Sequence, residues 1–166
     1  MKNVETNLRL EIRVCVLIII AGLFISGITA FPLETELAYL VKNIDYLPLI
    51  LKDWLTIIYT ALKATNENYP YLSYGTDWLA FAHLLLAVLF IGPLKNPLKN
   101  KWVIEFGIIC CISIIPLALI AGSIRKIPPF WQLIDCSFGA IAIIPLHLCL
   151  IKIKKLETIN SYELYL

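Results

Sequence analysis

The sequence predicts an all-α integral membrane protein, a four-helix bundle with an amphipathic helical outer loop between its first and second spans. The 166 residues are 60% hydrophobic and only 16% charged, with a mean hydropathy of +0.81. Soluble domains are about half apolar and a quarter charged. Four apolar segments are also long enough to cross a bilayer. Backbone groups in lipid must find partners within their own segment, which favours helices over open sheets.

The four expected spans are residues 14–31, 76–94, 102–122 and 130–151. Each has about 18–22 residues, against roughly 20 needed to cross the hydrocarbon core as a helix. The first span could instead be a cleaved signal peptide, because Arg9 and Arg13 precede it and Ala30 stands near its end. However, the apolar stretch is long for such a peptide, and Ile28 is unsuitable three positions before a cleavage point. We therefore expect a retained helix.

The distribution of Lys and Arg predicts the orientation of the spans. Three basic residues precede the first span, three lie between the second and third, and three follow the fourth. The opposite side has three in the long loop and two between the third and fourth spans. Basic residues favour the cytoplasmic side. We therefore expect a bacterial inner (plasma) membrane protein with both termini in the cytoplasm and residues 152–166 as a cytoplasmic tail.

The outer loop, residues 32–75, is expected to be helical rather than extended. Pro32 is typical of a helix start, and Glu34 and Glu36 would lie in the first turn, where the helix dipole favours anions. Residues 51–65 predict an amphipathic helix on the outer membrane surface or over the helix ends, as a lid or a substrate gate. Its polar stripe is Asp53, Thr56, Thr60 and Lys63, and its apolar stripe is Leu51, Trp54, Leu55, Ile58 and Leu62.

Four segments of the chain resemble, in the same order, a family of small, uncharacterised bacterial membrane proteins with four spans. They are "GITAFPLETEL" (27–37), "YGTDWLAFAH" (74–83), "KNKWVIEFG" (99–107) and "LIDCSFG" (133–139). The resemblance covers roughly residues 10–150. It implies the same four-span architecture, but no activity. The four spans, the outer loop and the tail together predict one membrane domain over residues 1–166.

Several polar side chains fall inside or beside the apolar spans. At a rise of 1.5 Å per residue, His83 would lie roughly 10 Å below the outer end of the second span, and Asp135 roughly 8 Å below that of the fourth. Asp77 lies at the rim, and Arg125 in the short outer loop. Unpaired charge in lipid is costly, so these groups should face the interior and pair. We expect His83 and Asp135 in contact, as a candidate ligand-binding site with Asp77 and Arg125 or as a contact that holds two helices together.

Glu105 and His147 form a second candidate polar pair, near the cytoplasmic ends of the third and fourth spans. Neither residue needs a special role, because both lie near water.

The sequence predicts no cofactor and no metal site. The two histidines differ in depth by roughly 15 Å, so one flat haem could not take both as ligands. Cys136 beside Asp135 matches no zinc spacing. The five cysteines lie in or beside the spans without a CxxC motif, so no disulfide framework is expected.

These features favour a non-enzymatic accessory, binding or sensor protein with a polar cluster in the outer leaflet. The alternative is a compact membrane enzyme or proton-handling carrier in which His83 is the catalytic acid–base and Asp135 orients it. A catalytic site should bring more polar groups together than this chain offers. The expected partner is the lipid bilayer, with a membrane protein or a second copy left open. Scattered basic residues and a net charge of +2 do not favour nucleic acid.

Overall fold

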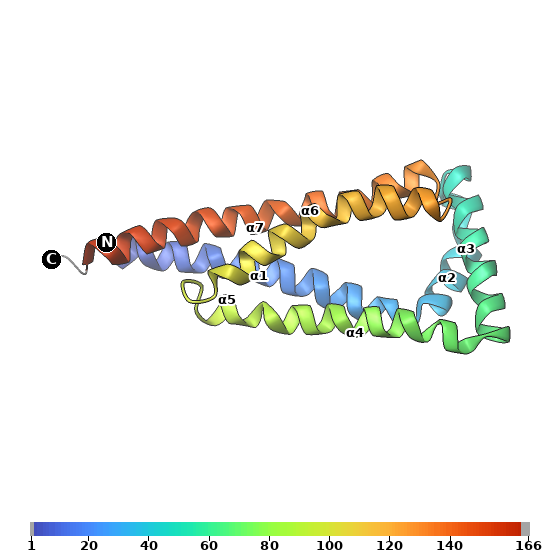
Figure 1. The fold of residues 1–166 in the computed structure, drawn as a ribbon, viewed down its shortest axis with the longest axis horizontal. Helices are drawn as coiled ribbons and strands as arrows, with labels where there is room; N and C mark the ends of the chain where they lie inside the picture. The colour runs from blue at the N-terminus through green and yellow to red at the C-terminus, as the bar shows by residue number, and fades with distance from the viewer. Residues whose placement is uncertain (1, 164–166) are drawn as a thin grey trace. The chain divides into compact units, whose positions relative to one another are not determined.

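The computed structural model describes residues 2–163, which are helical throughout apart from short connections and contain no strand (Figure 1). The α-helices are α1 (Lys2–Ala30), α2 (Leu33–Lys42), α3 (Leu49–Asn68), α4 (Tyr74–Leu89), α5 (Ile91–Lys95), α6 (Lys101–Ile124) and α7 (Pro129–Glu163). Two short 3-10 helices, η1 (Ile44–Tyr46) and η2 (Pro70–Leu72), flank α3. The all-α class predicted from the sequence is thus confirmed for the described residues.

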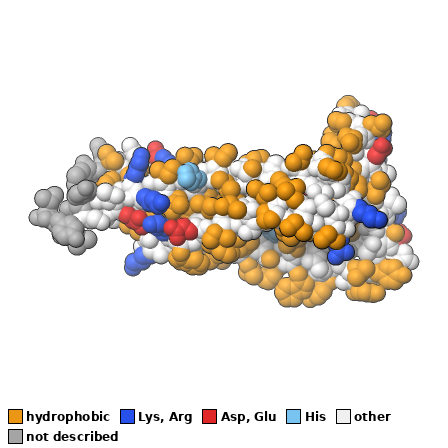
Figure 2. All heavy atoms as spheres, turned by 45° about the horizontal axis from the view of Figure 1, so that its top comes forward, with side chains coloured by type: hydrophobic (Ala, Val, Ile, Leu, Met, Phe, Trp, Pro, Cys, Tyr) orange, Lys and Arg blue, Asp and Glu red, His pale blue; other side chains and the backbone are white. Residues whose placement is uncertain are grey.

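Four helical segments in the described residues are long and apolar enough to cross a membrane: Val4–Ala30, Pro70–Lys95, Lys101–Ile124 and Pro129–Ser161. Each includes most or all of a predicted span. In Figure 2, apolar side chains cover much of the visible surface of the long helices, and charged side chains gather towards their ends. This pattern is consistent with a multi-pass membrane protein, because lipid replaces water around such apolar surfaces.

Two helices extend further than the expected spans. The first begins at Lys2 rather than near residue 14, and the last continues to Glu163, through most of the predicted tail. The apolar stripe of α7 explains the second difference, since Cys149, Ile153 and Leu156 recur at helical spacing and are almost completely buried. The remaining tail residues, 164–166, lie outside the described part.

The chain divides into two compact units, Met1–Ala21 with Ala87–Leu166 and Gly22–Leu86. The predicted packing of all four spans into a single bundle stays a prediction. Each unit is described by itself below.

In the first unit, α6 and α7 pack closely because small residues lie between them. A methyl group on Gly139 would sit 2.6 Å from the backbone carbonyl oxygen of Cys111. A methyl group on Gly107 would sit 2.9 Å from the Phe90 ring and 3.3 Å from Leu146. Glycine therefore allows the two helix backbones to approach each other, as small residues do in membrane helix pairs.

Helix α6 ends in a Schellman motif at the turn that leads to α7. The N–H of Ile127 donates to the Gly122 carbonyl oxygen at 2.9 Å, and the N–H of Lys126 to that of Ser123 at 3.2 Å. Lys126 occupies the left-handed position with a φ of 59°, where glycine is usual. Gln132, in the first turn of α7, is buried and donates through Nε2 to the Ile127 carbonyl oxygen at 2.7 Å.

At the other end of the first unit, ion pairs join three helices. Lys101, at the start of α6, lies 2.9 Å from Glu157 of α7. Lys152 of α7 pairs with Glu11 of α1. The beginning of α1, the beginning of α6 and the later part of α7 therefore meet at one end of this unit.

In the second unit, α2 and α3 form a helical hairpin closed by η1 (Figure 1). Leu37, Ile44 and Leu55 are its buried apolar residues. The predicted amphipathic stretch is helical and lies within α3, although its position on a membrane surface stays a prediction. The last part of α1 approaches α4 at Gly27, where a methyl group would meet the Ala80 carbonyl oxygen at 2.9 Å.

Candidate functional site

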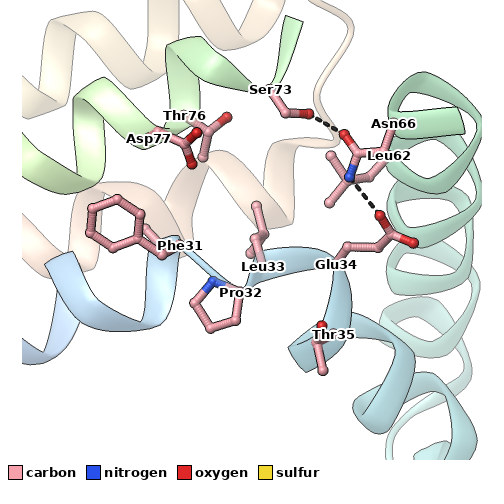
Figure 3. A pocket seen from close by; sticks show the side chains of 11 residues that line it. Phe31, Pro32, Leu33, Glu34, Thr35, Leu62, Asn66, Ser73, Thr76 and Asp77 are labelled. Atoms are coloured by element: carbon pink, nitrogen blue, oxygen red, sulfur yellow. Dashed lines mark hydrogen bonds between the residues drawn. The ribbon is translucent and has the colours of Figure 1, made fainter. Parts of the chain in front are cut away.

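A pocket of about 240 Å³ lies within the second unit, where α1 meets α2, α3 ends and α4 begins (Figure 3). All of its walls come from residues 22–86. Apolar residues form part of the wall, and carboxylates, hydroxyls and an amide form the rest. The lining residues are Ala30, Phe31, Pro32, Leu33, Glu34, Thr35, Leu62, Asn66, Ser73, Thr76 and Asp77.

A directed chain of hydrogen bonds runs along one side of the pocket. The Ser73 hydroxyl donates to Oδ1 of Asn66. Nδ2 of Asn66 in turn donates to Oε2 of Glu34 at 2.5 Å. Three separate elements thus meet here: α2 supplies Glu34, the last turns of α3 supply Asn66, and Ser73 directly precedes α4. Because its amide both accepts and donates, Asn66 holds the Glu34 carboxylate in one position.

Asp77 and Thr76 form the opposite side of the pocket (Figure 3). Asp77 lies in the first turn of α4, where the positive end of the helix dipole stabilises a carboxylate. It is half-buried. Its side chain makes no hydrogen bond or ion pair with any other described residue, so its carboxylate oxygens remain available to a ligand.

The charge of the pocket is not balanced by a neighbouring base. Two lysines of this unit pair elsewhere: Lys52 lies 3.0 Å from Asp45, and Lys63 lies 3.9 Å from Glu67. In the part of the chain that the structure describes, no Lys or Arg pairs with Glu34 or Asp77. A partly enclosed site with two carboxylates and no cation is complementary to a cationic group.

His83, the central candidate from the sequence, lies half-buried on α4. Its Nδ1 is 2.8 Å from the Leu79 carbonyl oxygen, one turn earlier. A carbonyl oxygen can only accept a hydrogen bond, so Nδ1 must be the donor in this bond. In a neutral imidazole the other nitrogen, Nε2, then carries no proton and can only accept. A carboxylate could therefore bond to Nε2 only if the imidazole were protonated.

Asp135 is half-buried on α7, and Arg125 is exposed at the end of α6. Both belong to the first unit, whereas His83 and Asp77 belong to the second. The expected contact between His83 and Asp135, and the outer cluster around it, stay predictions.

Glu105 on α6 and His147 on α7 are both exposed within the first unit. In the described part of the chain, Glu105 and His147 make no hydrogen bond or ion pair with each other. Their proposed pairing stays a prediction. Across residues 2–163, no three His, Cys, Asp or Glu side chains gather closely enough to hold a metal ion.

Sequence reasoning identified Asp77 but missed the residues that face it across the pocket. From the sequence, Glu34 is expected only to interact with the dipole of its helix, and Asn66 and Ser73 have no predicted role. The available signal was a run of polar side chains on both sides of Pro70, between two helical segments. These polar side chains form a site only because the hairpin brings Glu34 beside Asn66, which is 32 residues away in the chain.

The chain matches no known family model, no curated protein and no solved structure. Its four apolar helices and the pocket of its second unit are therefore the basis for a functional assignment.

Proposed function

We propose that this chain is a non-enzymatic accessory, binding or sensor protein of the bacterial inner membrane, which binds a small cationic ligand in the pocket of residues 22–86. The observation that carries the proposal is a pocket in which Glu34 and Asp77 face a common space without a paired base. The lipid bilayer surrounds the four apolar helices. A second membrane protein, or another copy of the chain, would receive the signal of ligand binding.

The chemistry of the pocket favours an ammonium group on a short apolar body. Asp77 would form a charge-assisted hydrogen bond with the ammonium, which is stronger than a bond between neutral groups. Glu34, held by Asn66, would supply a second acceptor, and Phe31 and Leu62 would contact the hydrocarbon part. The volume of about 240 Å³ lies below the usual range for drug-sized ligands, so the ligand should be small.

Two ion pairs support an orientation with both termini on one side. Glu11 pairs with Lys152 and Lys101 with Glu157, so the start of α1, the start of α6 and the end of α7 lie together. Four crossings separate the start of α1 from the end of α7, which also returns the chain to its starting side. The excess of basic residues there makes that side cytoplasmic, and the pocket then opens at the outer side.

Ligand binding is tested with the purified protein in nanodiscs by isothermal titration calorimetry. Propylammonium is the probe, and propanol and propionate are its neutral and anionic counterparts. Propylammonium should bind, and Asp77→Asn should weaken its binding by about tenfold or more, equivalent to about 1.4 kcal/mol. Asp53→Asn is the matched control, because Asp53 is an exposed carboxylate on α3 outside the pocket. Equal affinities for the amine and the alcohol would contradict a cation site.

Orientation is tested independently in cells. A reporter fused after Leu166 should be active in the cytoplasm. Thr60→Cys, on the exposed face of α3, should react with an impermeant maleimide added from outside. A periplasmic reporter signal, or labelling of Thr60→Cys only after permeabilisation, would reject the orientation.

A further inference from the structure

The end of the α2–α3 hairpin carries a group of apolar side chains that the fold leaves exposed. Tyr46 is 95% exposed, Leu49 72% and Ile50 59%. Leu47 is 39% exposed. These four residues, here called the hairpin tip, lie on both sides of Pro48 and form one continuous stretch with it. A contiguous apolar group of this kind marks a surface that contacts a partner or a membrane.

The hairpin itself does not need these residues for its packing. The inward face of α3 is already formed by Leu55, which is buried, and by half-buried residues at helical spacing from it such as Leu51 and Leu62. Ile50 points to a different side of the helix, since it lies about 140° from Leu55 at 100° per residue. The apolar side chains of the tip are therefore not used in packing α3 within the hairpin.

We propose that the hairpin tip inserts into the interfacial layer of the bilayer, on the side where α1 ends and α4 begins. Within the second unit, both ends of the hairpin continue directly into apolar helices that can cross a membrane. The hairpin is therefore tethered to the bilayer at both ends. A helix of 20 residues, such as α3, spans about 30 Å, so the tip stays within that distance of its anchor.

The chemistry around the tip fits lipid. Lys42 lies before the tip and is exposed, and its long basic side chain can extend from apolar surroundings to lipid phosphates. Lys52, after the tip, pairs with Asp45. Tyr46 is of the aromatic type that is enriched at membrane interfaces.

The first hydrogen bonds of α3 are donated by Leu51 and Lys52 to the Pro48 carbonyl oxygen, so the N–H groups of Leu49 and Ile50 have no acceptor within the helix. Water and headgroup oxygens can accept from them at the interface but not in the hydrocarbon core, so the insertion is shallow. This proposal does not depend on the ligand pocket.

Thiol labelling in nanodiscs that hold one copy of the protein tests the insertion. The discs contain phosphatidylcholine and phosphatidylglycerol, and the reagent is a water-soluble maleimide. Leu49→Cys should react about tenfold more slowly than Thr60→Cys, the control on the polar face of the same helix. The five native cysteines lie in the spanning helices, and the parent protein measures their background reaction. After unfolding in denaturant, the two introduced thiols should react at similar rates.

A second pair of variants separates insertion from local structure. Ile50→Cys should be protected in the parent background. Adding Leu49→Glu should remove most of that protection, because a carboxylate opposes insertion, whereas Leu49→Met should retain it. Rapid labelling of Leu49→Cys in single-copy discs would overturn the proposal. Protection that appears only in discs with two copies would also overturn it, because a second chain would then be the cover.

Discussion

Replacing Gly139 by alanine tests the close packing of α6 on α7 most directly. The new methyl carbon would lie 2.6 Å from the Cys111 carbonyl oxygen, well inside the 3.4 Å at which ordinary van der Waals contact begins. That oxygen belongs to the backbone of α6, so no side chain can rotate away to relieve the clash. The two helices must separate locally, and overpacking of this kind costs about 1–3 kcal/mol.

Gly22→Ala is the matched control, because a methyl group at Gly22 meets nothing within 4 Å. Both substitutions gain about 1 kcal/mol of helix propensity. The difference between the two free energies of unfolding therefore isolates the packing cost of about 1–3 kcal/mol. For a chain of this size, the Gly139→Ala variant should unfold roughly 2–12 °C below the Gly22→Ala variant.

The assay is thermal unfolding in detergent with a thiol-reactive fluorogenic dye. The buried Cys15, Cys111 and Cys149 become reactive as the helices separate. If Gly139→Ala proves as stable as Gly22→Ala, the close approach of the two helices is wrong.

Three further outcomes follow from the first unit, each measured by the same thermal assay. Lys126→Gly should raise the free energy of unfolding by about 1 kcal/mol, because the φ of 59° strains any residue with a side chain; an unchanged midpoint would contradict this backbone conformation. Gln132→Met should lower the free energy of unfolding by about 1–3 kcal/mol, since the partly buried Ile127 carbonyl oxygen loses its donor, and a neutral result would show that the bond is absent. Lys101→Met and Glu157→Gln should show a coupling of about 0.2–1 kcal/mol in a double-mutant cycle, reduced by salt; additive effects would show that the pair does not form.

The helices and their apolar character were predictable because they depend on local composition. Long apolar runs bounded by basic residues define the four spans without any knowledge of their partners. The helical extension through Ile153 and Leu156 was also present in the sequence, as an apolar stripe continuing past the last span. The basic residues Lys152, Lys154 and Lys155 in the same stretch are typical of a solvated tail, although the apolar periodicity continues through them.

The pocket was much less predictable, because it depends on contacts between distant segments. Nothing in the local sequence of Glu34 indicates Asn66, and only the hairpin brings them together. The left-handed conformation of Lys126 was equally hidden, since glycine is the residue that normally signals it. Asp77 was identifiable because a carboxylate beside an apolar span is unusual by itself.

The ion pair between Glu11 and Lys152 has a consequence for synthesis of the chain. Its two residues are separated by 141 positions. At about 5–20 residues per second, the ribosome needs roughly 7–28 s to produce the second after the first. Likewise, Lys101 can form its ion pair only after Glu157 has been synthesised, and Glu157 follows Lys152 in the chain. A nascent chain interrupted before Lys152 therefore has neither ion pair, and its first and third spans present unmatched charges to the insertion machinery and to membrane proteases. Completion of α7 is the event that closes this end of the protein.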